Sequence, residues 1–67
     1  MSPQQLAQII LRLRAAKGLS QKALAARAKV TQGYIAQLET GTRKNPSLPA
    51  LKRLAKALGV DVAELLS

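Results

Sequence analysis

Few side chains in this sequence can carry out covalent chemistry. The 67 residues include no His and no Cys, and the acids are Glu39, Asp61 and Glu64 alone. Without imidazole or thiol groups, the chain can have no Cys or His nucleophile, no zinc finger and no disulfide. Three carboxylates are also too few to favour a paired-acid or metal-carboxylate enzyme. We therefore expect no catalytic residue, no metal and no cofactor.

The side chains with a clear chemical preference are the cations. Eleven Lys and Arg against three acids give a net charge of +8. All the cations lie within residues 12–56, where Glu39 is the only acid, whereas residues 1–11 carry no charged side chain. A basic surface of this kind attracts a polyanion, although many small domains are basic only for solubility. A polyanionic partner is the first hypothesis, and plain solubility remains the alternative.

The apolar residues do not form a membrane segment. The longest apolar run is Ile9-Ile10-Leu11, whereas a bilayer-spanning helix needs about 20 apolar residues. No cationic start precedes a signal-like stretch, and the absence of Cys fits a reducing compartment. We expect no membrane association and a cytoplasmic, nucleoid-associated location.

The apolar residues and the helix-capping residues predict an all-α fold. Leu and Ala are abundant, and strand-like alternation is absent. Ser20, Thr31 and Ser47 are good N-caps, and Gly18 and Gly59 can end helices. The predicted helices span roughly residues 3–17, 21–28, 32–40, 48–58 and 62–66, in one domain over residues 1–67.

Three helix starts share a second signal. In each, an apolar residue before the cap can pack on another inside the first turn, as a hydrophobic staple. Asp61 and Glu64 also have the spacing of a capping box. The three staple pairs are Leu19–Leu24, Val30–Ile35 and Val60–Leu65.

The second and third predicted helices are unusually close in the sequence. Their caps, Ser20 and Thr31, are 11 residues apart, so a helix of about two turns is followed by a very short connection. Such a pair must cross at a steep angle, as in a helix-turn-helix unit, and Ala25 supplies a small side chain at the crossing. An ordinary corner between two helices remains the alternative.

Several groups of residues occur together in a recognisable order. They are Arg14-Ala15-Ala16-Lys17-Gly18-Leu19-Ser20-Gln21, Leu24-Ala25, Val30-Thr31-Gln32, Ile35, Gln37-Leu38-Glu39, Gly41, Asn45-Pro46-Ser47-Leu48 and Leu58-Gly59-Val60. This pattern resembles the lambda-repressor-like helix-turn-helix family, also called the Cro/repressor or xenobiotic-response-element type. The resemblance implies a five-helix DNA-binding domain that regulates transcription, usually as a homodimer on a near-palindromic operator, and often as a repressor.

The resemblance places the third helix in the major groove of DNA. Gln32, in its first turn, can form two hydrogen bonds with adenine. Gln37 lies roughly 140° around the helix from Gln32 and can flank the same face. Gly33 adds no side chain and allows close approach to a thymine methyl or to the backbone. These three are the expected base contacts, and surface polarity is the alternative for the two glutamines.

The resemblance also implies a set of contacts to the DNA backbone. Gln21 begins the second helix, where free N–H groups favour a phosphate. Tyr34, the only aromatic residue, can reach a phosphate through its hydroxyl or can instead pack half-buried against the first helix. The expected backbone contacts are Gln21, Thr31, Tyr34, Arg43, Lys44 and Asn45.

Glu39 needs a different explanation, because a carboxylate facing phosphates would oppose DNA binding. The family pattern pairs this position with Arg14 across the first and third helices. We expect Arg14 and Glu39 to form a structural ion pair that orients the third helix.

Two positions depart from the family pattern. Lys29 stands where glycine is usual in the turn, and a left-handed backbone there would cost roughly 1 kcal/mol. Gly33 sacrifices about as much helix propensity. The reading helix is therefore expected to be less rigid than usual.

The sequence leaves one other function open. The same fold can serve as an antitoxin or adaptor that binds a protein, such as a toxin or a co-regulator, and it would then have to use the surface of the domain itself. For the expected homodimer, Val60, Val62 and Leu66 are candidate interface residues, unless they complete the monomer's own core.

Overall fold

The computed structural model describes residues 2–66, which form five helices and no strand. They are α1 (Pro3–Ala16), α2 (Gln21–Ala28), α3 (Gln32–Thr40), α4 (Leu48–Leu58) and α5 (Val62–Leu66). The predicted all-α, five-helix fold is confirmed. The first helix ends one residue earlier than predicted, because Lys17 is its C-cap and the chain turns at Gly18, whose φ is +68°.

Side-chain caps explain where most of the helices begin. Ser20, Thr31 and Ser47 each accept a hydrogen bond from the backbone N–H three residues later, as an N-cap does. Ser2 and Gln5 form a reciprocal capping box on α1 that the sequence analysis did not identify. These contacts are local, so the starts of the helices follow directly from the sequence.

The start of α5 differs in detail from the prediction. The Asp61 carboxylate accepts from the N–H of Ala63, at 3.5 Å, rather than from the N–H of Glu64. The N–H of Glu64 donates instead to the backbone carbonyl of Asp61, at 3.0 Å. Asp61 therefore accepts hydrogen bonds at the start of α5 through both its carboxylate and its backbone carbonyl.

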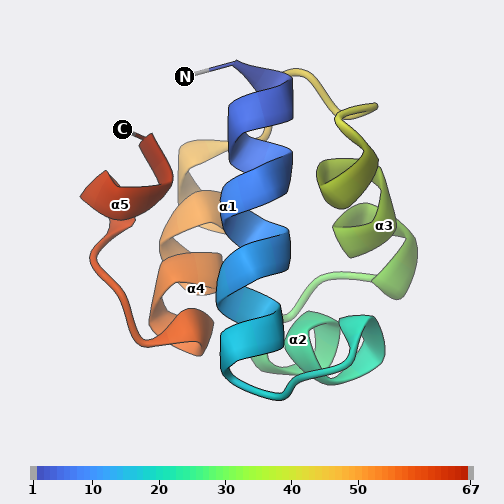
Figure 1. Cartoon of the computed structure of the whole chain (residues 1–67), viewed down its shortest axis with the longest axis vertical. Coiled ribbons are helices and arrows are strands. Elements are labelled where there is room, and N and C mark those ends of the chain that lie inside the picture. The colour runs from blue at the N-terminus through green and yellow to red at the C-terminus, as the bar shows by residue number, and fades with distance from the viewer. Residues whose placement is uncertain (1, 67) are drawn as a thin grey trace.

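The core lies around α1, which runs through the middle of the molecule (Figure 1). In this view α3 lies on one side of α1, α4 and α5 lie on the other, and α2 lies across the end of α1. The inner residue of each predicted staple is buried, and the outer residue packs against the same cluster. The fully buried large side chains are Leu6, Ile10, Leu24, Ile35, Leu38, Leu54, Leu58 and Leu65.

The turn between α2 and α3 gives this pair its close packing. Ala25 is 4% exposed, in agreement with the small side chain expected at the crossing. The N–H of Val30 donates to the carbonyl of Ala25, and Arg53 on α4 donates through Nε to the carbonyl of Ala28, both at 3.0 Å. The end of α2 is thus held by its own turn and by a cation from α4.

Lys29 has the left-handed backbone that its place in the turn suggested, with φ 58° and ψ 43°. It is the only residue other than glycine with positive φ between residues 2 and 66. A residue with a Cβ pays about 1–2 kcal/mol for this conformation. The turn therefore stores strain that a glycine would not.

Replacing Lys29 by glycine should stabilise the fold. Relief of the strain exceeds the entropy that glycine adds to the unfolded chain, so Lys29→Gly should raise the free energy of unfolding by about 0.5–1 kcal/mol. Urea denaturation would measure the free energy of unfolding. Lys52→Gly, at an exposed position inside α4, is the matched control and should lower the free energy of unfolding by about 1 kcal/mol. A loss of stability in both variants would show that the backbone of Lys29 is not strained.

Candidate nucleic-acid interface

The structure brings Arg14 on α1 and Glu39 on α3 into direct contact. Arg14 donates through Nε to Glu39 Oε2 at 2.5 Å and through Nη2 to Oε1 at 3.0 Å. Its remaining terminal nitrogen, Nη1, donates to the carbonyl of Leu19 at 2.8 Å. The contact is bidentate and charge-assisted, which is the strongest and most directional form of this pairing.

Gln21 completes the surroundings of the Glu39 carboxylate. Its amide nitrogen donates to Glu39 Oε1 at 2.9 Å, so this residue, predicted to contact DNA, also has a structural partner. The Glu39 and Arg14 side chains are 5% and 17% exposed. Hydrogen bonding to Glu39 raises the pKa of Arg14 against the opposing effect of burial. The acid of α3 is therefore paired within the domain, with Arg14 as its cationic partner.

The first turn of α3 presents polar groups to solvent. Thr31, the N-cap, accepts from the N–H of Tyr34 at 3.0 Å, which leaves its hydroxyl hydrogen available to donate. Gln32 and Gly33 are exposed, and the Gln32 amide makes no hydrogen bond within residues 2–66. This amide is therefore able to donate and accept at the same time.

The far end of α3 carries a cluster that the sequence analysis did not predict. Arg43, in the loop after α3, donates through both Nε (3.1 Å) and Nη2 (2.8 Å) to the side-chain oxygen of Gln37. The Arg43 guanidinium also lies over the Tyr34 ring, 4.5 Å from its centroid. Arg43, predicted to contact the DNA backbone, thus holds the side chain of Gln37, predicted to contact a base.

Tyr34 is half-buried and packs against the core. Its hydroxyl is covered and has no hydrogen-bond partner among the described residues. This arrangement favours the packing alternative raised for Tyr34. A phosphate contact would need the side chain to move.

The loop of residues 41–47 supplies the remaining predicted backbone contacts. Arg43, Lys44 and Asn45 are all exposed. Within residues 2–66, Lys44 makes no ion pair. The loop therefore places two exposed cations beyond the C-terminal end of α3, where an anion would be attracted.

The candidate dimer residues do not share one environment. Val60 and Val62 are half-buried and pack against the core, whereas Leu66 is 41% exposed. The two valines thus serve the monomer, at least in part. Leu66 alone of the three is an exposed apolar side chain.

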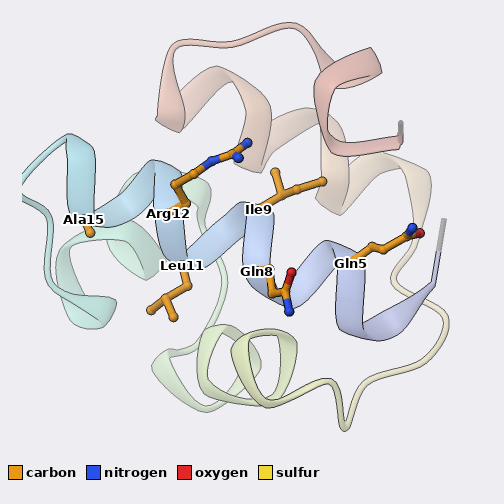
Figure 2. A pocket seen from close by; sticks show the side chains of 6 residues that line it. All are labelled: Gln5, Gln8, Ile9, Leu11, Arg12 and Ala15. Atoms are coloured by element: carbon orange, nitrogen blue, oxygen red, sulfur yellow. The ribbon is translucent and has the colours of Figure 1, made fainter.

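The surface also has a shallow hollow along α1. Figure 2 shows Ile9 and Arg12 projecting to one side of the helix and Gln8 and Leu11 to the other. Leu11 is 46% exposed. The residues that line this hollow include no pair of acids and no set of convergent cations. The hollow therefore does not indicate a particular small-molecule ligand.

Comparison with known proteins identifies the family. The helix-turn-helix model HTH_3 matches residues 10–65. The chain belongs to the helix-turn-helix family. It is of the xenobiotic-response-element, lambda-repressor-like type, whose proteins are DNA-binding transcription regulators. Relatives of this helix-turn-helix protein are accordingly named as transcriptional regulators.

Two relatives illustrate this similarity. The chain is 46% identical over 56 residues to the uncharacterized HTH-type transcriptional regulator y4dJ of Sinorhizobium fredii, covering 84% of this chain and 71% of that protein. It is 39% identical over 57 residues to the HTH-type transcriptional regulator SlrR of Bacillus subtilis. That match covers 84% of this chain but only 38% of SlrR.

Solved structures of other helix-turn-helix regulators have the same fold. The restriction-modification controller protein C.AhdI of Aeromonas hydrophila superposes with a TM-score of 0.89 at 38% identity, over 94% of both chains. SinR, the master regulator for biofilm formation, solved in complex with DNA, gives a TM-score of 0.89 at 34% identity, covering 92% of this chain and 98% of that chain. Within residues 2–66, no helix of the present protein is long and apolar enough to cross a membrane.

Breaking the ion pair should destabilise this helix-turn-helix fold. Arg14→Met leaves the mostly buried Glu39 carboxylate with Gln21 as its one remaining polar partner among residues 2–66, so the free energy of unfolding should fall by about 3 kcal/mol. Glu39→Gln should also destabilise, since it removes the charge that Arg14 pairs with. Thermal and urea denaturation would measure both.

A double-mutant cycle separates this pairing from a general effect of losing charge. The variant carrying both changes should lose less stability than the two single losses added together, because neither charge is then left unpaired. Arg12→Met, which removes an exposed cation from the same helix, should leave stability within about 0.5 kcal/mol of the parent. Strictly additive losses would show that the two residues do not act as a pair.

Proposed function

We propose that residues 1–67 act as one DNA-binding domain of a cytoplasmic, nucleoid-associated repressor, with α3 in the major groove of double-stranded DNA. The observation that carries this proposal is the exposed Gln32 amide at the start of α3, which makes no hydrogen bond within residues 2–66, together with the cations of the 41–47 loop at the other end of the helix. The one acid on α3 is already neutralised by Arg14. An anion approaching α3 therefore meets hydrogen-bonding groups and positive charge without opposition.

Base reading is proposed for the exposed residues of α3. Gln32 can donate to N7 and accept from N6 of adenine, because both halves of its amide are available. Gly33 leaves room beside it. A Cβ built at Gly33 would meet only Thr31 Oγ1, at 3.9 Å, so the packing of the domain does not require a glycine there. Close approach of the helix to DNA would explain a glycine at this position, whereas the packing of the domain does not.

Contacts to the sugar-phosphate backbone are proposed for the groups around this helix. Thr31 has a hydroxyl hydrogen to donate, and Gln21 keeps a second amide N–H beyond the one given to Glu39. Lys44 and Arg43 supply charge, and Asn45 supplies an amide. Contacts of this kind position a protein on DNA without reading sequence.

A homodimer on a near-palindromic operator is proposed because one copy is small. A single module of this size buries only about 600–1,000 Å² on DNA, and a second copy on a half-site one helical turn away is the usual way to gain affinity. The exposed Leu66 and Leu11 are apolar groups that such an interface could cover. SinR, a structural neighbour at 34% identity, has been solved in complex with DNA, and this supports DNA binding by the fold.

A second candidate function is a protein-interaction module of the antitoxin or adaptor kind. One neighbour favours it, because SinR has also been solved in complex with the protein SinI, at 34% identity and a TM-score of 0.88. Selection of bound duplexes from a random pool distinguishes the two functions. A chain that retains no sequence from a random duplex pool, yet binds one protein stoichiometrically, would support the second.

Selection from a random pool of duplexes tests the main proposal, and the expected product is two inverted half-sites. On the selected site, Gln32→Ala should remove discrimination at one base pair in each half-site, at a cost of about 1–3 kcal/mol. Lys44→Ala should weaken every duplex similarly and reduce the salt slope by about 1. Lys56→Ala is the control, since α4 lies across α1 from α3 (Figure 1), and it should leave binding unchanged. Unaltered affinity in the first two variants would refute the assigned interface.

Gly33→Ala should separate stability from binding. Alanine is favoured over glycine inside a helix by about 0.8–1.0 kcal/mol, and no close contact opposes it, so the free energy of unfolding should rise by roughly that amount. If Gly33 lies against DNA, operator affinity should fall in the same variant. Urea denaturation and fluorescence anisotropy would measure the two effects, and a stabilised variant with full affinity would show that Gly33 is remote from the DNA.

A further inference from the structure

Gln37 differs from Gln32 in the state of its amide. Arg43 Nε and Nη2 both donate to Gln37 Oε1, at 3.1 and 2.8 Å. A carbonyl oxygen has two lone pairs, so these two bonds use its accepting capacity. Arginine has only donors, which fixes the orientation of the amide, with its oxygen toward Arg43 and its NH₂ group directed away.

We propose that Arg43 converts Gln37 into a donor-only group, which reads guanine and discriminates against adenine. This proposal rests on the proposed function, in which α3 lies in the major groove. Arg43 is then a specificity-determining positioning residue. It acts on the bases through Gln37, in addition to any contact it makes with phosphate.

The chemistry of the major groove gives the preference. Guanine presents two acceptors, N7 and O6, and can receive both amide hydrogens of Gln37. Adenine presents one acceptor, N7, beside the N6 amino donor, which needs the carbonyl that Arg43 occupies. Thymine offers one acceptor, O4, and cytosine only a donor. The expected order at this position is guanine first, adenine and thymine next, and cytosine last.

Neighbouring contacts hold the pair in this geometry. The Arg43 guanidinium is stacked on Tyr34, which is itself packed against the core. The backbone N–H groups of Thr42 and Arg43 both donate to the backbone carbonyl of Gln37, at 3.0 and 3.2 Å. Gln37 is thus connected to the loop through its main chain and its side chain, so its amide orientation is set before DNA arrives.

Gln32 provides an internal comparison, because its amide makes no hydrogen bond within the described part of the chain. It keeps both a donor and an acceptor, and this combination matches adenine. Two glutamines on one helix should therefore read different bases. The difference comes from Arg43 and not from the residue type.

The experiment measures binding to four duplexes that differ only at the base pair where Gln37→Ala removes discrimination. The parent should bind the guanine duplex about ten-fold or more tightly than the adenine duplex. Arg43→Met keeps an unbranched side chain near Tyr34 but frees the Gln37 carbonyl. In this variant the ratio of guanine to adenine affinity should fall at least several-fold, toward or past unity, whatever the overall loss of affinity.

Lys44→Met is the matched control, since it removes a neighbouring cation that does not contact Gln37. It should weaken all four duplexes by a similar factor and leave the ratio unchanged. Gln37→Glu should lose the guanine preference, because a carboxylate can still accept from Arg43 but has no hydrogen to donate. Denaturation of each variant would establish that it folds.

Three results would overturn the proposal. They are an adenine preference in the parent, a ratio unchanged by Arg43→Met, and a Gln37→Ala variant that keeps full discrimination at every position. None of these three results would contradict sequence-specific DNA binding by the parent. The loss of base discrimination expected for Gln32→Ala would also be unaffected. Failure of the parent to select any duplex would instead remove the proposed function together with this inference.

Discussion

The carboxylate of Glu39 is the group on which the arrangement of the reading helix depends. It lies on α3, accepts two hydrogen bonds from Arg14 on α1, and accepts a third from Gln21 at the start of α2. Arg14 also holds the carbonyl of Leu19, just before α2. Apolar packing is non-directional, so the core alone leaves some freedom in the rotation of α3. A bidentate ion pair has a required geometry and removes that freedom.

The same pair decides the charge of the surface. An unpaired acid on α3 would repel phosphate, but Glu39 is 5% exposed and neutralised by Arg14. The exposed groups around α3 include Gln32, whose amide makes no hydrogen bond within residues 2–66, and the basic loop beyond Gly41. One interaction therefore serves both the orientation of α3 and its electrostatic compatibility with a polyanion, which fits a family of DNA-binding regulators.

Much of this fold could be predicted because its signals are local. An N-cap side chain and the backbone N–H that donates to it lie three residues apart, and the left-handed backbone of Lys29 follows from its place in a short turn. The hydrogen bond from Arg53 to the carbonyl of Ala28 joins residues 25 positions apart, and no pattern in the sequence predicted it. The contact between Arg43 and Gln37 was also missed, because the path of an irregular loop is not encoded by periodicity.

By itself the sequence determined the number of helices and, to within one residue, their limits, together with the absence of His and Cys chemistry and the family to which the protein belongs. These follow from residue type and short-range spacing. Only the tertiary structure decided which polar groups are left available. Folding directs two Arg43 donors to the Gln37 oxygen and covers the Tyr34 hydroxyl, whereas the Gln32 amide stays exposed and makes no hydrogen bond within residues 2–66. The hydrogen-bonding capacity of a side chain is a property of its type, but whether that capacity is already used depends on residues that only folding brings near.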